Sequence, residues 1–408
     1  MTGSRLGEVY DPTGAHLQDP YPLFERARRS EPVFYSARLQ AWVVTRYDDV
    51  DAILKDPGTF SSTNSLRPVG ELYPATFAEL AAGYPPTPDH VTSDGAAHHR
   101  LRAAYAARLT AGVVRTLEPV IRARAESLIA EFVDDRRVEL VSQFASRLPM
   151  EVAAELFGIA AEDVPAARSG TESLFQLGNA ALTAGAQAQA AARFVALQRL
   201  LAGYIRDRRA AATGDLISHV VAELAPGDEP LTAEQEAELV NTVSGTIGAG
   251  HITTTHTITI AVRWLLTEPE QWSLLRQRPD LVPNAVEETL RFDAPVATIF
   301  RRCTRPAALG STTIPADSDV LVVFASANRD GSHFREPDRF DVTRPPSRHF
   351  AFGAGPHTCL GAALARAQAR VALRVLTERL PQPRLVPGQT IGVHSFNLRG
   401  PQALRLHW

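Results

Sequence analysis

The segment that most constrains the fold is residues 231–266, which predicts one very long helix. Thr232 and Gln235 match a capping box at its start, and Glu268-Pro269 would end it. About 34 residues at roughly 1.5 Å each give a helix on the order of 50 Å long, enough to cross the whole molecule. A domain built around such a helix is expected to be mainly helical.

The rest of the chain fits a mainly α fold with a small β region, an α+β arrangement, in a single domain covering residues 1–408. A short helix is expected at residues 22–30, and residues 61–93 predict a long loop with one short helix near 76–82. From residue 97 to about 380 most segments have helical periodicity, with breaks expected at Pro149, Pro165, Pro226–Pro230 and Pro279. Strands are expected as a pair at residues 33–35 and 41–45, at 312–315 and 320–324, and as a pair within 392–408 around Arg399-Gly400.

Composition argues against several classes of protein. The net charge of −3 disfavours general nucleic-acid binding, and a hydrophobic content of 45% supplies a sizeable core. Residues 1–20 hold no apolar stretch long enough for a signal peptide or a membrane anchor, and the chain has only two cysteines. We therefore expect a soluble monomer in the cytoplasm, with no nucleic-acid partner and no membrane partner.

Cys359 lies between a glycine-rich loop and a predicted amphipathic helix, in the run 352–361. With Cys303 as the only other cysteine, a disulfide framework is not expected. Helix N-terminal amides stabilise a thiolate, and Gly353 and Gly355 allow a positive φ and a close backbone approach. Apolar residues recur at helical spacing after the cysteine: Leu360, Leu364, Ala367, Val371 and Val375. The pattern indicates a nucleophile or a ligand to one metal centre; a zinc site, a cysteine protease and an inert buried cysteine are the alternatives.

This run resembles the haem-thiolate signature F-G-x-G-x-H-x-C-x-G of the cytochrome P450 family at every specified position. The resemblance implies the cytochrome P450 fold, haem b as the cofactor, and Cys359 as the metal ligand on the proximal side of the iron. It also implies that Phe352, Gly353, His357 and Gly361 belong to the haem-binding loop. The resemblance is to bacterial members of the family, which agrees with the expected cytoplasmic location.

A haem carries two propionates, which need fixed cations or hydrogen-bond donors. His98 and Arg102 are four residues apart, on one face of a predicted helix, and resemble the family's H-x-x-x-R beside the propionates. By the same resemblance, Arg301 and His357 fit the remaining propionate positions. The alternatives that could face the site from the predicted helix are Arg100 and Tyr105.

Glu288 and Arg291 resemble the family's E-x-x-R pair, about seventy residues before the cysteine. The resemblance implies that this pair is buried and structural, whereas an isolated pair at this spacing would be a solvated surface contact. Arg339 is the expected third member of the network. These residues would hold the fold, and we assign them no chemistry.

The centre of the long helix is rich in residues that form helices poorly. They are Gly245, Gly248, Gly250, Thr253, Thr254, Thr255, Thr257 and Thr259. Close packing against another helix and a widened turn over the haem are the two interpretations. Residues 249–254 resemble the family's A-G-x-[Asp/Glu]-T-T, which implies that Ala249 contacts the cofactor and that Thr253 is catalytic. Ile252 replaces the acid that passes protons on in the family, so His251 or a substrate group would have to supply them.

The resemblance implies a monooxygenase that oxidises a small organic molecule in bacterial secondary-metabolite biosynthesis, with electrons from a ferredoxin or flavodoxin. The helix face of Arg366, Arg370 and Arg374 is either the docking surface for that partner or a solvated basic face. Because Ile252 cannot relay protons, oxidative coupling, cyclisation or desaturation without oxygen insertion is a second hypothesis. A non-catalytic haem sensor is a third. Candidate walls of a substrate pocket are residues 61–93, 174–184, 252, 296–299 and 395–397.

Overall fold

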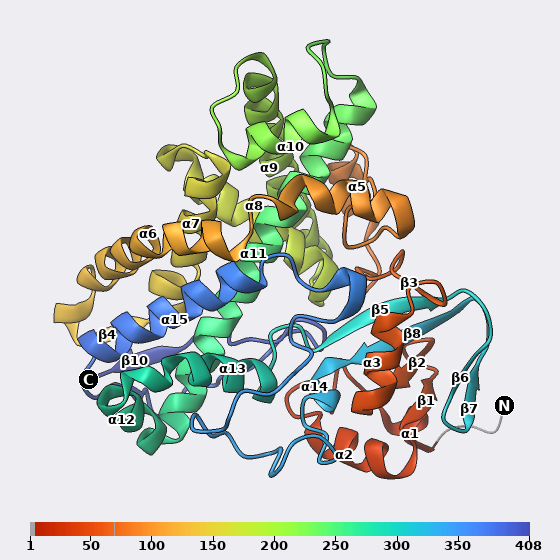
Figure 1. Cartoon of the computed structure of the whole chain (residues 1–408), viewed down its shortest axis with the longest axis vertical. Helices are drawn as coiled ribbons and strands as arrows, with labels where there is room; N and C mark the ends of the chain where they lie inside the picture. Colours follow the sequence, from red (N-terminus) through yellow and green to blue (C-terminus); the bar gives the residue numbers. More distant parts are fainter. Residues whose placement is uncertain (1–4, 69) are drawn as a thin grey trace. The chain divides into compact units, whose positions relative to one another are not determined.

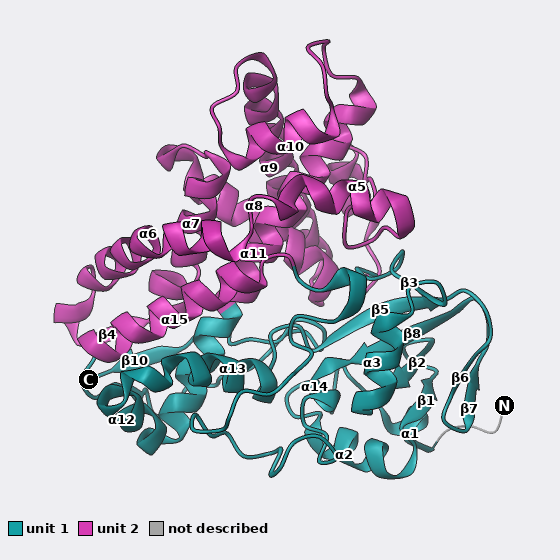
Figure 2. Ribbon diagram, in the orientation of Figure 1, with its two compact units in different colours: residues 1–67, 256–359, 380–408 teal, residues 68–255, 360–379 magenta. Residues whose placement is uncertain are grey.

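The computed structural model describes residues 5–68 and 70–408, and most of them are helical (Figure 1). The chain divides into two compact units (Figure 2). Unit 1 contains residues 1–67, 256–359 and 380–408, and unit 2 contains residues 68–255 and 360–379. The mainly helical fold with a small β region is therefore confirmed, whereas the single domain expected for residues 1–408 stays a prediction.

Unit 2 is built almost entirely from helices. They are α4 (Pro74–Leu80), α5 (Gly95–Ala106), α6 (Ala111–Ala130), α7 (Arg147–Phe157), α8 (Val164–Asn179), α9 (Ala184–Ala210), α10 (Leu216–Leu224), α15 (Ala362–Arg379) and the first part of α11 (Ala233–Thr267). A short strand, β4 (Arg137–Glu139), and a π-helical turn at Val141–Ala145 precede α7. Helix α8 packs on α9, and α6 packs on α15.

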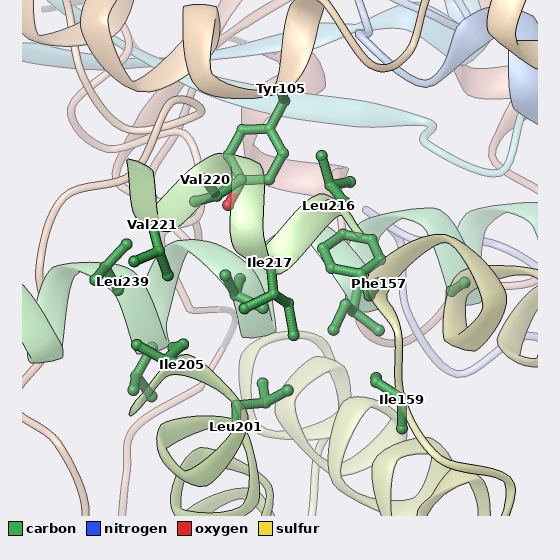
Figure 3. Close-up of a cluster of buried hydrophobic side chains, with 14 of the residues drawn as sticks. Tyr105, Phe157, Ile159, Leu201, Ile205, Leu216, Ile217, Val220, Val221 and Leu239 are labelled. Carbon is green, nitrogen blue, oxygen red and sulfur yellow. The ribbon is translucent and has the colours of Figure 1, made fainter. Parts of the chain in front are cut away.

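The core of unit 2 is a cluster of aliphatic and aromatic side chains from six of these helices (Figure 3). Tyr105 of α5, Phe157 of α7, Ile217 of α10 and Leu239 of α11 are all buried in it. The sequence directs α10 into this core because six of its nine residues are apolar. Asp215 begins α10 as its N-cap, and its carboxylate accepts a hydrogen bond from the Ser218 amide at 2.7 Å.

Unit 1 contains a five-stranded sheet with the order β1-β2-β8-β5-β3. The strands are β1 (Val33–Ser36), β2 (Ala41–Val44), β3 (Phe60–Ser61), β5 (Thr298–Cys303) and β8 (Ser318–Val323). Strand β2 pairs with β1 in the antiparallel direction and with β8 in the parallel direction. The helices of this unit are α1 (Arg5–Val9), α2 (Tyr21–Ser30), α3 (Tyr47–Lys55), α12 (Pro269–Gln277), α13 (Val282–Phe292), α14 (Phe324–Ala327) and the last part of α11.

The expected strand pair at residues 33–35 and 41–45 is confirmed, with Val33 opposite Val44. The strands expected at 312–315 and 320–324 are β7 (Thr312–Ile314), which pairs with β6 (Ala307–Leu309), and β8. The strand pair expected within 392–408 is wrong. Instead β10 (Arg405–His407) pairs with β9 (Arg384–Leu385), and around Arg399 the described chain forms only an isolated bridge between Leu398 and Val296. The tail thus finds its partners elsewhere in the sequence.

The capping box at the start of α11 is confirmed by both of its hydrogen bonds. The Gln235 amide donates to Thr232 Oγ1 at 3.2 Å, and the Thr232 amide donates to Gln235 Oε1 at 2.9 Å. The helix ends at Thr267, one residue before Glu268-Pro269, after 35 residues. Among residues 5–68 and 70–408, we find no helix with the length and apolarity needed to cross a membrane.

The prolines act as helix boundaries in two ways. The segment Pro226–Pro230 lies between α10 and α11, and Pro279 begins a 3-10 turn between α12 and α13, so the expected breaks are present there. Pro149 and Pro165 instead lie in the first turns of α7 and α8. Proline is tolerated there because the first amides of a helix have no intrahelical partner. These two residues therefore belong to the starts of helices.

Candidate functional site

The loop before Cys359 has the backbone that its glycines were expected to provide. Gly353 and Gly355 have φ values of +65° and +67°, and the Cys359 amide donates to the Phe352 carbonyl at 2.9 Å. A Cβ at position 355 would lie 2.2 Å from the Leu54 carbonyl oxygen, so only glycine fits between the loop and α3. The loop is thereby fixed against the sheet side of unit 1.

Cys359 lies three residues before α15, which begins at Ala362, and its side chain is exposed. This agrees with the prediction that the cysteine lies at or just before a helix start. Cys303 has the opposite environment. It is 0% exposed in β5, its thiol donates to the Arg305 carbonyl at 2.9 Å, and burial raises its pKa. Cys303 is therefore the inert thiol of the pair.

The residues predicted to bind the propionates lie on three elements. His98 and Arg102 share one face of α5, where His98 is 2% exposed. Burial, and then the nearby charge of Arg102, lower the pKa of His98. In unit 1, Arg301 is buried in β5 and donates to Ser65 Oγ at 2.7 Å, and His357 is half-buried in a 3-10 turn at Gly355–His357.

The two alternatives on α5 are engaged elsewhere. Tyr105 is 0% exposed in the core of unit 2, and its hydroxyl lies 3.4 Å from Thr242 Oγ1. Arg100 forms an ion pair with Glu238 at the surface. Both alternatives therefore have partners within unit 2, and the assignment of His98 and Arg102 stays a prediction.

The centre of α11 uses its small residues in different ways. A Cβ at Gly248 would lie 2.8 Å from the ring of Phe175 in α8. This glycine therefore allows α11 to pack closely against α8, which agrees with the interpretation of close helix packing. The Thr253 hydroxyl donates to the Ala249 carbonyl at 2.7 Å, so these two predicted site residues are joined directly. Ile252 is buried. The segment thus contains both a packed face and a face with an oriented hydroxyl.

His251 is held on the packed face of α11. Its side chain is 0% exposed, with Nε2 3.0 Å from the Ser146 carbonyl and Nδ1 2.8 Å from Thr171 Oγ1. The Ser146 hydroxyl in turn donates to Glu172 at 2.8 Å. Residues two apart on a helix point about 200° apart, so His251 points away from the side chain of Thr253. This placement disfavours His251 as the proton source for Thr253.

The pair of Glu288 and Arg291 is buried as predicted, with both side chains 2% exposed. The prediction that Arg339 is the third member of this network is wrong. The side chain of Arg339 is 61% exposed, and its only link to the pair is its backbone carbonyl, which accepts a hydrogen bond from Arg291 at 3.2 Å. Arg344 takes the place instead, with Nε 3.1 Å from the Glu288 carboxylate. Sequence reasoning missed Arg344 because nothing in the local pattern separates the two arginines.

The basic face of α15 is partly paired with acidic side chains. Arg370 pairs with Glu118 at 3.1 Å and Arg374 with Glu378 at 2.7 Å, so part of this face is neutralised within unit 2.

A cavity of about 800 Å³ in unit 1, beside Tyr21, Trp264 and Arg329, contains none of the predicted site residues. We therefore do not assign that cavity to the candidate site.

The thiol of Cys359 is the candidate metal ligand of the site. Within the described residues, no three His, Cys, Asp or Glu side chains converge in a way that could hold a metal ion. An exposed thiol that follows a glycine-fixed loop fits a haem with a thiolate ligand, and basic side chains suit its two carboxylates. The same set does not fit a closed tetrahedral zinc site.

Comparisons with known proteins agree with this chemistry. A family model described as cytochrome P450 matches residues 205–380. The chain is 35% identical over 392 residues to cytochrome P450 107B1 of Saccharopolyspora erythraea, which covers 94% of this chain and 93% of that protein. It is 36% identical over 374 residues to the mycinamicin IV hydroxylase/epoxidase of Micromonospora griseorubida, with 90% of each chain covered.

Solved structures give the same answer for the fold. The P450 heme domain of Tepidiphilus thermophilus matches with a TM-score of 0.91 and 29% identity, over 99% of this chain and 97% of that chain. An intact type IV self-sufficient cytochrome P450 monooxygenase matches with a TM-score of 0.92 and 30% identity over 100% of this chain. This chain spans about half of that longer protein, 53% of its length. The chain therefore belongs to the cytochrome P450 family, as a haem b monooxygenase with a small-molecule substrate and a redox partner.

Proposed function

We propose that this enzyme inserts oxygen into a small organic molecule of bacterial secondary metabolism. The observation that carries the proposal is Cys359, an exposed thiol placed three residues before α15 by a loop that requires glycine at 353 and 355. Relatives of similar length support the substrate class. They include the mycinamicin IV hydroxylase/epoxidase and the cytochrome P450 monooxygenase PikC of Streptomyces venezuelae, which is 34% identical over 96% of this chain.

In this proposal Cys359 binds the haem iron as a thiolate, and haem b supplies the activation of dioxygen when it is bound. The amides at the start of α15 and the positive end of its dipole stabilise the thiolate form of the cysteine. Gly353 and Gly361 let the backbone approach the cofactor closely, and Phe352 places an apolar side chain beside it. Gly361 directly precedes α15, and its carbonyl accepts a hydrogen bond from the Ala365 amide at 2.8 Å.

The propionates are assigned to His98 and Arg102 of α5, to Arg301 of β5 and to His357. Each of these side chains is buried or half-buried. Two carboxylates would accept charge-assisted hydrogen bonds from such groups. The basic character of these side chains therefore supports their assignment to an acidic ligand.

Thr253 is assigned to proton handling on the oxygen side, and Ala249 to contact with the cofactor. The hydrogen bond from Thr253 to the Ala249 carbonyl fixes the direction of the hydroxyl proton and leaves the oxygen lone pairs as acceptors. Ile252 contributes an apolar side chain where the family has an acid, and His251 is bound to Ser146 and Thr171. We therefore assign proton supply to solvent or to a polar group of the substrate.

Oxygen insertion is favoured over coupling, cyclisation or desaturation because a named relative is a hydroxylase/epoxidase. The test begins with a screen for compounds that shift the Soret band of the ferric protein. Each hit is then turned over under labelled dioxygen with NADPH and a redox partner. Label in the product supports the proposal, whereas a dehydrogenated or coupled product without label would overturn it. Absence of substrate-dependent NADPH consumption with every hit would instead favour a haem sensor.

Ferredoxin or flavodoxin is proposed as the electron donor, and an acidic partner would be attracted to a basic face. The basic residues Arg366, Arg370 and Arg374 on one face of α15 support such a surface, and Arg370 and Arg374 also pair with glutamates. The monomeric state and the cytoplasmic location expected from the sequence stay predictions.

A further inference from the structure

His90 has a buried ring nitrogen that the assignments above do not use. Its Nδ1 is inaccessible to solvent and has no hydrogen-bond partner among the residues that the structure describes. Leaving a buried donor or acceptor unpaired costs about 1–3 kcal/mol, so such an atom needs an explanation. His90 belongs to the loop that leads into α5, and it lies within unit 2.

The position of His90 relates it to the proposed propionate ligands. Its ring packs against the ring of Tyr105, with 5.7 Å between the centroids. Tyr105 is three residues after Arg102 and seven after His98, so the three lie along one stripe of α5. Long side chains of a helix lean toward its N-terminus, so the Tyr105 ring lies over the turn that contains Arg102. His90 therefore lies beside the same stripe as His98 and Arg102.

Asp89, the residue before His90, is bound within its own loop. Asp89 turns back on its own loop, where Oδ1 accepts hydrogen bonds from the amides of Val91 and Thr92 at 2.8 and 2.9 Å and from the Thr92 hydroxyl at 3.0 Å. Among the residues that the structure describes, no hydrogen-bond partner of His90 Nδ1 is found, Asp89 included.

Both acidic and basic groups act on the imidazoles in this corner of unit 2. Burial lowers the pKa of His90, the charge of Asp89 acts in the opposite direction, and the charge of Arg102 lowers it further. The pKa of His98 is lowered by burial and by Arg102, His99 and His90, with Asp94 opposing them. An anion bound beside these imidazoles would favour their protonated forms.

We propose that His90 is a further haem-binding residue, whose Nδ1–H donates a hydrogen bond to the propionate that His98 and Arg102 bind. The inference rests on the proposed function, because it takes the position of that propionate from the assignment of the α5 stripe. It adds a donor from the loop before α5 to the donors already assigned on α5, β5 and the cysteine loop. His90 would act as a cofactor-binding residue and would take no part in the reaction itself.

The test is the rate at which the ferric holoenzyme loses haem to an excess of apomyoglobin. His90→Phe keeps a ring against Tyr105 and removes both nitrogens, and His90→Gln keeps a donor. We expect haem loss from His90→Phe to be about tenfold faster than from the wild type, the scale of one hydrogen bond to a charged group. We expect His90→Gln to lie near the wild type. Resonance Raman bands of the propionates should shift in His90→Phe as well.

His219→Phe is the matched control, since His219 of α10 also has a buried nitrogen without a hydrogen-bond partner among the described residues of unit 2. We expect this variant to lose haem at the wild-type rate. Equal rates for His90→Phe and the wild type would overturn the proposal, and so would equal acceleration in His90→Phe and His219→Phe. A wild-type protein that lacks a thiolate haem spectrum would contradict the proposed function, whereas a normal spectrum with unchanged haem loss would contradict only the role of His90.

Discussion

Arg291 donates two hydrogen bonds to the carboxylate of Glu288, with Nε 2.7 Å from Oε2 and Nη2 2.8 Å from Oε1. Both side chains are 2% exposed, so this pair is fully inside unit 1. Arg291 also donates to the carbonyls of Asn328 and Pro337 at 3.0 and 2.8 Å. The pair thereby fastens α13 to the segment that follows β8, and its role is structural.

Glu288→Gln should destabilise the protein strongly. The variant leaves Arg291 and Arg344 near an uncharged group, and breaking a buried ion pair from one side costs about 3–5 kcal/mol. The free energy of unfolding from urea titration measures this loss. Arg339→Gln is the control, because that guanidinium is 61% exposed and its removal should change stability by no more than about 0.5 kcal/mol. A larger loss in Arg339→Gln than in Glu288→Gln would contradict the network.

Gly355→Ala should disturb the cysteine loop more than Gly388→Ala. Both positions have a positive φ, of +67° and +74°, so each substitution carries backbone strain of about 1–2 kcal/mol. Only Gly355 faces an obstacle, the Leu54 carbonyl oxygen 2.2 Å from the added Cβ, whereas nothing lies within 4 Å at Gly388. We expect Gly355→Ala to have a lower Tm and a lower ratio of Soret to protein absorbance than Gly388→Ala. Equal values for the two variants would show that the close approach to α3 is unimportant.

His256 should make the stability of the protein depend on pH. Burial lowers its pKa to about 4, while the same imidazole in the unfolded chain has a pKa of about 6.5. Between these values the unfolded state binds more protons, so stability is fully present above about pH 6.5 and falls as the pH is lowered toward 4. The loss reaches about 3 kcal/mol when the pH passes the lower value.

Urea unfolding of wild type and His256→Asn at pH 7 and pH 5 measures the contribution of His256. We expect the difference in unfolding free energy between the two pH values to be smaller in the variant. Gly400 must remain in both proteins, because a Cβ there would lie 2.3 Å from the imidazole ring. The same pH dependence in both proteins would place the titration elsewhere.

Thr253→Ala should uncouple electron supply from product formation. The variant removes the hydroxyl that is oriented by the Ala249 carbonyl. Losing a proton-transfer group lowers the rate of product formation by about a hundredfold or less. The measurement is product formed and peroxide released per NADPH consumed, with a substrate found in the Soret screen. Thr254→Ala is the control, since Thr254 lies on another face of α11. Unchanged product yield in Thr253→Ala would remove this residue from proton handling.

His251→Phe separates the two roles considered for that imidazole. The variant removes the imidazole that now hydrogen-bonds to the Ser146 carbonyl and to Thr171 Oγ1. The free energy of unfolding should therefore fall by about 1–3 kcal/mol. Because the ring faces α7 and α8, the yield of product per NADPH should not change. A lower yield with unchanged stability would reverse the assignment and make His251 the proton source.

Features that depend on residues close in sequence were predictable. The capping box joins Thr232 to Gln235 and the buried pair joins Glu288 to Arg291, so three-residue spacing on a helix already brings the partners together. The left-handed backbone at Gly353 follows from glycine itself. In each case the chemistry and the geometry are set by one turn of chain.

Features that depend on tertiary contacts were not predictable in the same way. Arg344, and not Arg339, binds Glu288. The irregular segment after Pro337 directs the guanidinium of Arg344 inward and that of Arg339 into solvent. Strand β5 was missed because Arg301 and Arg302 interrupt its apolar pattern, and burial of Arg301 requires the Ser65 loop. The pairing of β10 with β9 joins strands about twenty residues apart, and no local signal fixes that choice.

The central claim is that Cys359 provides the thiolate ligand of the haem. The most direct measurement is the absorption spectrum of the reduced protein under carbon monoxide, recorded for wild type, Cys359→Ser and Cys303→Ser. We predict the strongly red-shifted Soret band of a thiolate-bound haem in the wild type and in Cys303→Ser, and its loss in Cys359→Ser. A Cys359→Ser protein that keeps the red-shifted band, or a wild type that lacks it, would contradict the account.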